Sequence, residues 1–235
     1  MLKLSGLEAG YGQVQVLWGI DLEVPKGEIT CIVGSNGAGK TPLLRAISRV
    51  VRGTHGTIVF DGIDLTNATP AEVIRSGIAH VPEGRRLIRG LPVRDNLLLG
   101  AYVRAGNRAE LRQDLDFVYD LFPILRERQS QDATTLSGGE QQMCAIGRGL
   151  MSRPKLLMID ELSLGLAPRA VERVTEALLE IRKTGTTIVI VEQDVLTALE
   201  LAQHGAVIEL GRVALAGRTE TLERDPRVRQ AYMGI

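Results

Sequence analysis

The stretch G-S-N-G-A-G-K-T at residues 34–41 constrains this chain more than any other feature. It follows an apolar run at 29–33 and precedes a helix-forming segment at 43–47. This is the strand, glycine loop and helix context that a G-x-x-x-x-G-K-[ST] pattern requires. Glycines let the backbone curl so that successive N–H groups point at an anion, and the helix dipole adds positive charge there. The pattern predicts a phosphate-binding loop, with a plain glycine turn before a helix as the structural alternative.

Each residue of this loop and the one after it is a candidate nucleotide contact: Gly34, Ser35, Asn36, Gly37, Ala38, Gly39, Lys40, Thr41 and Pro42. The Lys40 ammonium is expected to reach the terminal phosphates of ATP, and the Thr41 hydroxyl to bind Mg²⁺. Pro42 is sterically acceptable in a first helical turn, but it has no N–H to donate to a phosphate and disfavours the helical conformation at Thr41. We therefore expect Pro42 to weaken nucleotide binding.

The composition favours one compact α/β unit of 235 residues in a reducing compartment. Because 28 basic residues balance 28 acidic ones, nothing in the bulk charge calls for nucleic acid or an anionic membrane. Cys31 and Cys144 are expected to be small buried apolar residues, while His55, His80 and His204 are expected to be structural or exposed. Neither a signal peptide nor a bilayer-spanning segment is apparent, so a cytoplasmic location is expected.

The hydrophobic pattern predicts an α/β fold in which a helical insertion interrupts the sheet. Strands are expected over 2–24, 56–62, 78–81, 156–159 and 187–191, with a final hairpin at 206–215. Helices are expected over 70–75, 93–102, 108–121, from 139 onward, and over 170–183 and 195–202. We interpret residues 1–235 as a single domain: an α/β P-loop core with an antiparallel β subdomain at about 1–87 and 152–235, and a helical subdomain at about 88–151.

Two further stretches carry chemistry. The apolar strand at 156–159 ends in Asp160 and Glu161, where a P-loop enzyme holds Mg²⁺ and activates water; a solvated acidic turn is the alternative. Residues 137–140, which are Ser137, Gly138, Gly139 and Glu140, begin a predicted helix and offer a second anion site through free N–H groups. Since one subunit has no evident use for two such sites, the second is expected to close over the γ-phosphate bound by a partner copy.

Taken in this order, the loop at 34–41, L-S-G-G-E at 136–140 and L-M-I-D-E at 157–161 resemble Walker A, signature and Walker B of an ABC-type ATPase. The resemblance covers essentially the whole chain and implies the ABC ATPase fold with a RecA-like core. Segments 81–86, 163–168, 191–194 and 228–234 are similar to those of the ATP-binding subunit of branched-chain amino-acid importers. This implies a head-to-tail dimer that binds two ATP and drives transmembrane permease subunits on the inner face of the membrane, served indirectly by a solute-binding protein.

The resemblance also assigns three single residues. Tyr11 matches the aromatic residue that stacks on adenine, Glu83 stands where a glutamine usually contacts Mg²⁺, and Gln193 stands where a histidine usually contacts the γ-phosphate. A carboxylate can still coordinate Mg²⁺, and a glutamine can donate a hydrogen bond but cannot titrate like imidazole. The alternatives are an ordinary turn tyrosine, a surface glutamate and a surface residue at a helix N-terminus.

We therefore hypothesise an ATP-hydrolysing importer subunit with Glu161, Lys40 and Gln193 as catalytic candidates, and Thr41, Glu83 and Asp160 as Mg²⁺ ligands. Pro42 and Gln193 motivate an alternative, a nucleotide-gated interaction protein that hydrolyses poorly. A soluble ABC ATPase acting on ribosomes or DNA is disfavoured, since the chain has no second cassette, long coiled coil or basic excess. The solute stays open among branched-chain amino acids, urea and short amides, as does a homodimer against pairing with a sister cassette.

Overall fold

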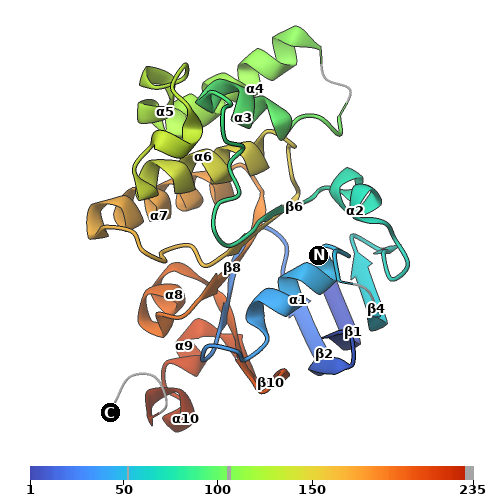
Figure 1. Ribbon diagram of the computed structural model, residues 1–235. Helices are drawn as coiled ribbons and strands as arrows, with labels where there is room; N and C mark the ends of the chain where they lie inside the picture. Colours follow the sequence, from blue (N-terminus) through green and yellow to red (C-terminus); the bar gives the residue numbers. More distant parts are fainter. Residues whose placement is uncertain (52, 105–106, 231–235) are drawn as a thin grey trace.

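Two β-sheets organise the computed structural model, which describes residues 1–51, 53–104 and 107–230 (Figure 1). The smaller sheet is antiparallel, with strand order β2-β1-β4-β5. Its strands are β1 (Leu2–Tyr11), β2 (Val14–Val24), β4 (His55–Phe60) and β5 (Ile63–Asp64). This sheet packs its apolar face against helix α1 (Lys40–Ile47), which follows the glycine loop.

The larger sheet has the order β10-β9-β3-β8-β7-β6 and is parallel except for its edge strand β10. Its strands are β3 (Ile29–Val33), β6 (Ile78–Val81), β7 (Leu156–Asp160), β8 (Thr187–Glu192), β9 (His204–Glu209) and β10 (Arg212–Arg218). Pairing places Val33 opposite Glu192 and Asp160 opposite Val191. The carboxyl ends of β3, β7 and β8 therefore meet at one edge of the sheet, where ligands of such sheets bind.

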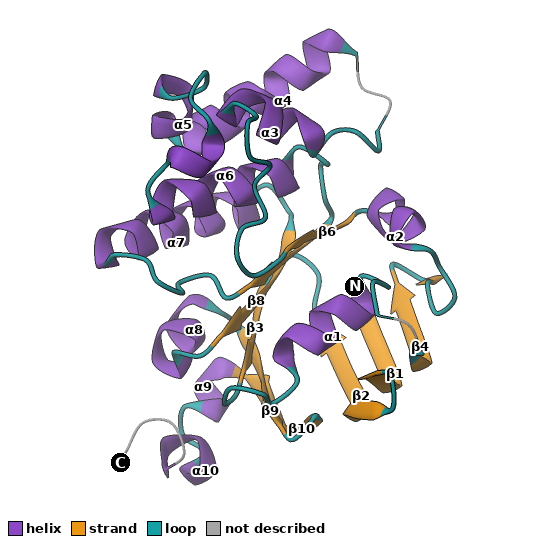
Figure 2. Cartoon of the chain, viewed as in Figure 1, coloured by secondary structure: helices purple, strands orange, loops and turns teal. Residues whose placement is uncertain are grey.

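The helices between β6 and β8 gather above the larger sheet in Figure 2, whereas the helix after the glycine loop lies beside the smaller sheet. The helices up to the signature segment are α1 (Lys40–Ile47), α2 (Pro70–Ser76), α3 (Val93–Leu99), α4 (Arg108–Leu121), α5 (Pro123–Glu127), the 3₁₀ turn η1 (Ala133–Thr135) and α6 (Gly138–Leu150). They are followed by α7 (Pro168–Lys183), α8 (Val195–Leu201), α9 (Thr219–Leu222) and α10 (Pro226–Val228). Helix α6 contacts α3, α4, α5 and α7 as well as β6 and β7, so it joins the helical layer to the sheet.

Two apolar cores lie on the two faces of the larger sheet. In β3, Ile29, Cys31 and Val33 face the helical core, whereas Ile32 faces the core shared with the smaller sheet. A strand buried on both faces reads as a continuous apolar run, which is why this segment lacks polar alternation. Cys31 and Cys144 are buried and unpaired, as expected, and burial raises the pKa of each thiol to about 12.

The expected α/β class, antiparallel subdomain and helical insertion are confirmed. One boundary was wrong: the helix expected over 93–102 ends at Leu99. The division at about 88 and 151 stays a prediction, and residues 231–234 of the C-terminal segment lie outside the described residues. Across the described ranges, no helix is both long and apolar enough to cross a membrane.

Candidate nucleotide-binding and catalytic site

The glycine loop connects β3 to α1 and needs its glycines for close backbone approach. A Cβ on Gly34 would lie 2.2 Å from the carbonyl oxygen of Ile208, and Gly37 has a φ of 80°. Gly39 caps α1 in the left-handed region, with a φ of 110°. Side chains at these positions would displace the loop or strain it. Ser35, Asn36 and Gly37 are exposed at its tip, so their N–H groups are accessible to a phosphate.

Lys40 holds the loop in this shape. Its Nζ donates to the carbonyl oxygens of Gly34 at 2.7 Å and Ser35 at 3.0 Å. Burial lowers the pKa of Lys40, while the carboxylates of Glu161, Asp160 and Glu192 oppose that shift. The ammonium is therefore placed between loop carbonyls and acidic side chains, where a phosphate can replace the carbonyls as its partner.

Pro42 occupies the third position of α1, in the first turn, where a backbone N–H has no carbonyl partner within the helix. The helix therefore loses no hydrogen bond to the proline, and Leu43 N still donates to Gly39 O at 3.0 Å. The Ala38 oxygen, just before the helix, accepts from Gly211 N at 2.8 Å, across the turn between β9 and β10. What the proline removes is one N–H that an anion could otherwise use.

Thr41 and Asp160, the two residues expected to bind a cation together, lie in direct contact. Thr41 Oγ1 donates to Asp160 Oδ1 at 2.9 Å. Asp160 is 1% exposed, and its Oδ2 has no hydrogen-bond partner among the described residues. Burial raises the pKa of Asp160 to about 6, with Glu83 and Glu161 adding repulsion and the Thr41 hydrogen bond opposing the shift. A buried carboxylate oxygen without a partner, beside a hydroxyl, is a donor set that suits Mg²⁺.

Glu161 and Gln193 are brought together from β7 and β8. Glu161 follows β7 with a φ of 53°, an uncommon left-handed conformation for a non-glycine residue, and its N–H donates to Val191 O at 3.0 Å. Gln193 Nε2 donates to Glu161 Oε1 at 2.6 Å. The carboxylate is therefore oriented at the sheet edge that also carries the loop and Asp160.

Tyr11 and Glu83 lie at the margins of this site. Tyr11 ends β1 with 43% of its surface exposed, and its Oη accepts a hydrogen bond from Arg45 Nη1 at 3.3 Å. Glu83 is exposed after β6, close enough to Asp160 to raise its pKa by charge repulsion. Both side chains reach the surface, and their roles in adenine stacking and cation binding stay predictions.

The turn at 137–140 begins α6 with a capping box. Ser137 N donates to Glu140 Oε2 at 2.9 Å, and Glu140 N to Ser137 Oγ at 3.5 Å. Arg128 pairs with Glu140 at 3.3 Å, and a Cβ on Gly139 would lie 2.6 Å from that of Ala170. Among the described contacts of this turn, none comes from the glycine loop, and α6 lies in the helical layer away from α1 (Figure 1). The two anion sites of one chain are therefore separate.

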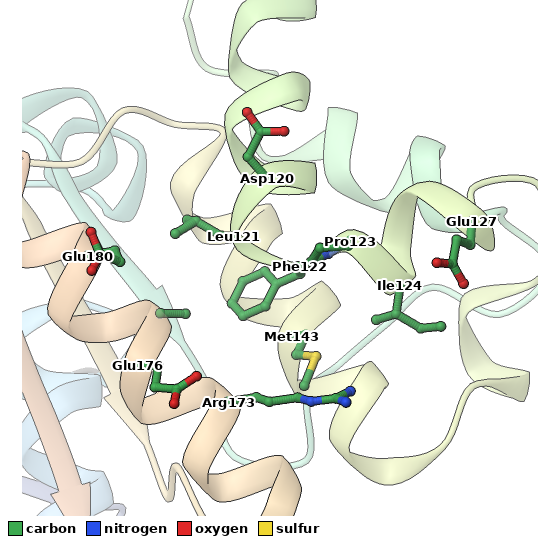
Figure 3. A pocket seen from close by; sticks show the side chains of 11 residues that line it. Asp120, Leu121, Phe122, Pro123, Ile124, Glu127, Met143, Arg173, Glu176 and Glu180 are labelled. Carbon is green, nitrogen blue, oxygen red and sulfur yellow. The ribbon is translucent and has the colours of Figure 1, made fainter.

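A cavity of about 740 Å³ lies elsewhere, between the α4–α5 junction, α6 and α7. Figure 3 shows Phe122 and Met143 in this cavity, with Arg173 and Glu176 on helix α7. None of its lining residues belongs to the glycine loop or to the carboxyl ends of the strands. This cavity is separate from the candidate nucleotide site.

Two residues of the site region were missed in the sequence. Glu192 is a buried carboxylate at the end of β8, beside Gln193, and Arg148 of α6 donates to Arg86 O at 2.7 Å and Arg85 O at 2.8 Å. Only Glu192 had a sequence signal, since a carboxylate at the end of an apolar strand is unusual inside a protein. His80, which was expected to be structural or exposed, makes a structural contact: its Nδ1 lies 2.9 Å from Ser48 Oγ at the end of α1.

The fold and these residues define a P-loop nucleotide-binding protein with a helical insertion. A family model described as ABC transporter matches residues 17–163. The chain belongs to the ABC transporter family, as one of its ATP-hydrolysing subunits.

Individual relatives cover the full chain. It is 42% identical over 234 residues to the high-affinity branched-chain amino acid transport ATP-binding protein BraG of Pseudomonas aeruginosa, covering 100% of both chains. It is 34% identical to the probable branched-chain amino acid transport ATP-binding protein LivF of Archaeoglobus fulgidus, covering 100% of this chain and 99% of the other. A solved ATP-binding subunit of an ABC transporter superposes with a TM-score of 0.86 at 27% identity, covering 100% and 96% of the two chains.

Proposed function

We propose that this chain binds and hydrolyses ATP to power an importer of branched-chain amino acids or related small solutes. The observation that carries the proposal is the assembly of Thr41, Asp160 and the Gln193-held Glu161 at one sheet edge beside the glycine loop. The solute class comes from the BraG and LivF relatives, whose printed names specify branched-chain amino acids. The chain's own site recognises ATP and has no contact with the solute.

Each site residue then has a role. The loop N–H groups and the Lys40 ammonium bind the phosphates, and Tyr11 stacks on the adenine. Thr41 and Asp160, with Glu83 at the margin, hold Mg²⁺, which neutralises phosphate charge when bound. Glu161 accepts a proton from the attacking water, and the amide of Gln193 keeps the carboxylate aimed at that water.

The turn at 137–140 acts on the ATP of a second ATPase subunit. The glycine loop of the same chain is not among the described contacts of this turn. The N–H groups that begin α6 would therefore bind an anion held by another subunit. In a head-to-tail dimer, Ser137, Gly138 and Gly139 of one copy cap the γ-phosphate bound to Lys40 of the other. ATP favours the closed dimer because these contacts exist only in that state. A homodimer and a pair with a sister cassette both satisfy this geometry.

A shallow groove suits a permease segment. It has a volume of about 270 Å³ and lies between α2 and β6 on one side and α3 and α6 on the other. Its apolar side chains include Tyr102, which is 87% exposed, with Leu99 and Ile74. Arg148 also lines the groove and donates a hydrogen bond to the backbone after Glu83. A permease segment bound in the groove would therefore contact the segment that leads to the cation site. We place the chain on the inner face of the membrane, bound through this groove and serving a solute-binding protein only indirectly.

Sedimentation of Glu161→Gln with and without Mg-ATP tests the composite site. We expect monomers without nucleotide and dimers with it, because ATP stays intact and closure persists. Adding Lys40→Ala should abolish the dimer, while Lys183→Ala, at an exposed pair with Glu180, should not. Two results together would favour the nucleotide-gated interaction protein. The wild-type chain would bind ATP without hydrolysing it, and dimers would form only in the double variant Glu161→Gln/Pro42→Thr.

Pull-down from membranes tests the groove. Tyr102→Glu should lose the co-purifying permease and retain ATP binding, because it charges an exposed apolar contact far from the loop. Tyr102→Phe is the matched control. Retention of the permease by Tyr102→Glu would place the docking surface elsewhere.

A further inference from the structure

Glu192 is a buried carboxylate that the nucleotide site leaves without a role. It ends β8, is 3% exposed, and directly precedes Gln193. Among the described residues it forms no ion pair with lysine or arginine within 4.0 Å. A buried charge without an ionic partner must be stabilised by hydrogen bonds.

Its hydrogen bonds all go to two residues. Glu192 Oε1 accepts from Ser163 N at 2.8 Å. Glu192 Oε2 accepts from Ser163 Oγ at 3.0 Å and from Gln193 N at 3.2 Å. Each carboxylate oxygen therefore accepts a hydrogen bond from a backbone N–H. Only a side chain with an acceptor at both positions can satisfy both donors.

The two residues belong to different segments of the site. Gln193 orients Glu161. Ser163 begins the loop at 163–167, which leads to α7. This loop borders a cavity of about 420 Å³ together with the turn at 137–140, and its Leu164 carbonyl accepts from Arg85 at 3.5 Å. Glu192 thus joins the water-activating pair to the loop beside the signature turn.

We propose that Glu192 is a positioning residue that holds the loop at 163–167 and Gln193 in one arrangement, so that hydrolysis by Glu161 is coupled to closure of the two subunits. The inference rests on the proposed function, since closure is a property of the ATP-bound dimer. Glu192 itself touches neither nucleotide nor water in this role. It acts through Ser163 and Gln193.

Glu192→Gln is the sharpest change because it keeps the size of the side chain. A carboxamide has one acceptor oxygen, so either Ser163 N or Gln193 N then faces an NH₂ group. Ser163→Ala removes only the hydroxyl and leaves both backbone hydrogen bonds. Glu200→Gln, on the exposed side of α8, is the matched control.

In the otherwise wild-type chain, Glu192→Gln should lower kcat by at least about tenfold, the worth of one charge-assisted hydrogen bond, while monomer ATP affinity changes less than about twofold. Ser163→Ala should lower kcat by a few-fold and Glu200→Gln should leave it unchanged. A purely structural residue would instead lower the melting temperature and ATP affinity together. That joint loss, or an unchanged kcat, would overturn the role.

The same substitutions in the Glu161→Gln background separate this inference from the proposed function. If Glu161→Gln dimerises with Mg-ATP and Glu161→Gln/Glu192→Gln does so at least about tenfold more weakly, the positioning role is supported. If both dimerise equally, the positioning role alone fails. If neither dimerises, the composite site and the positioning role fall together. Should Glu192→Gln not fold, Ser163→Ala decides: unchanged dimerisation would overturn the role and weaker dimerisation would support it.

Discussion

Gln193 Nε2 lies 2.6 Å from Glu161 Oε1, so Gln193, where the resemblance implies a histidine, directly orients the carboxylate that we propose to activate water. Gln193→Ala should lower kcat by about ten- to a hundredfold with little change in ATP affinity, because an unoriented base is a poorer base. Gln193→Glu, of the same size, should be at least as damaging since it sets two carboxylates against each other. Steady-state ATPase assays measure both; full activity in Gln193→Ala would show that the hydrogen bond has no catalytic use.

A titratable group at the same position should change the pH profile. Glutamine does not ionise, whereas histidine has a pKa of about 6.5. We expect Gln193→His to gain a change in kcat with a midpoint at about pH 6.5 that the wild-type profile lacks. Identical profiles for the two proteins would mean that position 193 does not influence the rate-limiting step.

Pro42 is expected to weaken phosphate binding without weakening α1, because the N–H that it lacks has no partner within the helix. Pro42→Ala restores the N–H, and Pro42→Thr adds a hydroxyl, while Ala38 O keeps its donor from Gly211. Each variant should bind Mg-ATP about tenfold more tightly, as one charge-assisted hydrogen bond allows. The free energy of unfolding should change by less than about 1 kcal/mol. Calorimetric titration and urea unfolding measure the two quantities, and unchanged affinity in both variants would show that phosphate does not use this N–H.

His80 should make stability depend on pH. Burial lowers the pKa of His80 from 6.5 to about 4, with Arg45 adding repulsion. Between these values the unfolded chain binds a proton that the folded chain does not, so the free energy of unfolding falls as pH decreases from 6.5 to 4. The contribution is up to about 3 kcal/mol.

Urea unfolding at several pH values tests this prediction. His80→Gln keeps a polar group for Ser48 and should show a shallower loss of stability in acid than the wild-type chain. His55→Gln, at an exposed position, is the control and should match the wild type. Equal acid slopes for His80→Gln and wild type would contradict the buried neutral imidazole.

The ionised Asp160 carboxylate should lower the stability of the fold while providing a ligand for the cation. Its pKa is raised to about 6, chiefly by burial, so the ionised form destabilises the fold by up to about 3 kcal/mol above that pH. Without nucleotide, Asp160→Asn should be more stable than wild type at pH 8. This advantage should vanish below about pH 4, where the carboxyl is protonated in both states.

Thermal unfolding with and without Mg-ATP completes this test. Asp160→Asn should lose most of the stabilisation that Mg-ATP gives, since its carboxamide is a poor ligand for a hard cation. Asp61→Asn removes an exposed carboxylate that pairs with Lys155 and should behave as wild type. A nucleotide-free Asp160→Asn that is less stable than wild type would show that the carboxylate is stabilising as it stands.

The local pattern was enough to predict the glycine loop, the apolar strands and the acidic pair after β7. These features depend on residues close together in the chain: glycines before a helix, a run of buried aliphatic residues, and a carboxylate where such a run ends. The family resemblance placed Tyr11, Glu83 and Gln193 around them. Boundaries such as Leu99 depended on packing and were less accurate.

Contacts between distant segments could not be read from the chain. The donor to the Ala38 oxygen beside the glycine loop comes from Gly211, and the partners of Glu192 come from the segment at 163 as well as from its own neighbour. The sequence by itself determined which chemical groups the site contains, because the glycine loop and the strand ends are local patterns. Only the tertiary structure decided which oxygens are buried, which N–H groups have acceptors and which side chain orients Glu161, because those depend on how parallel strands align at one sheet edge.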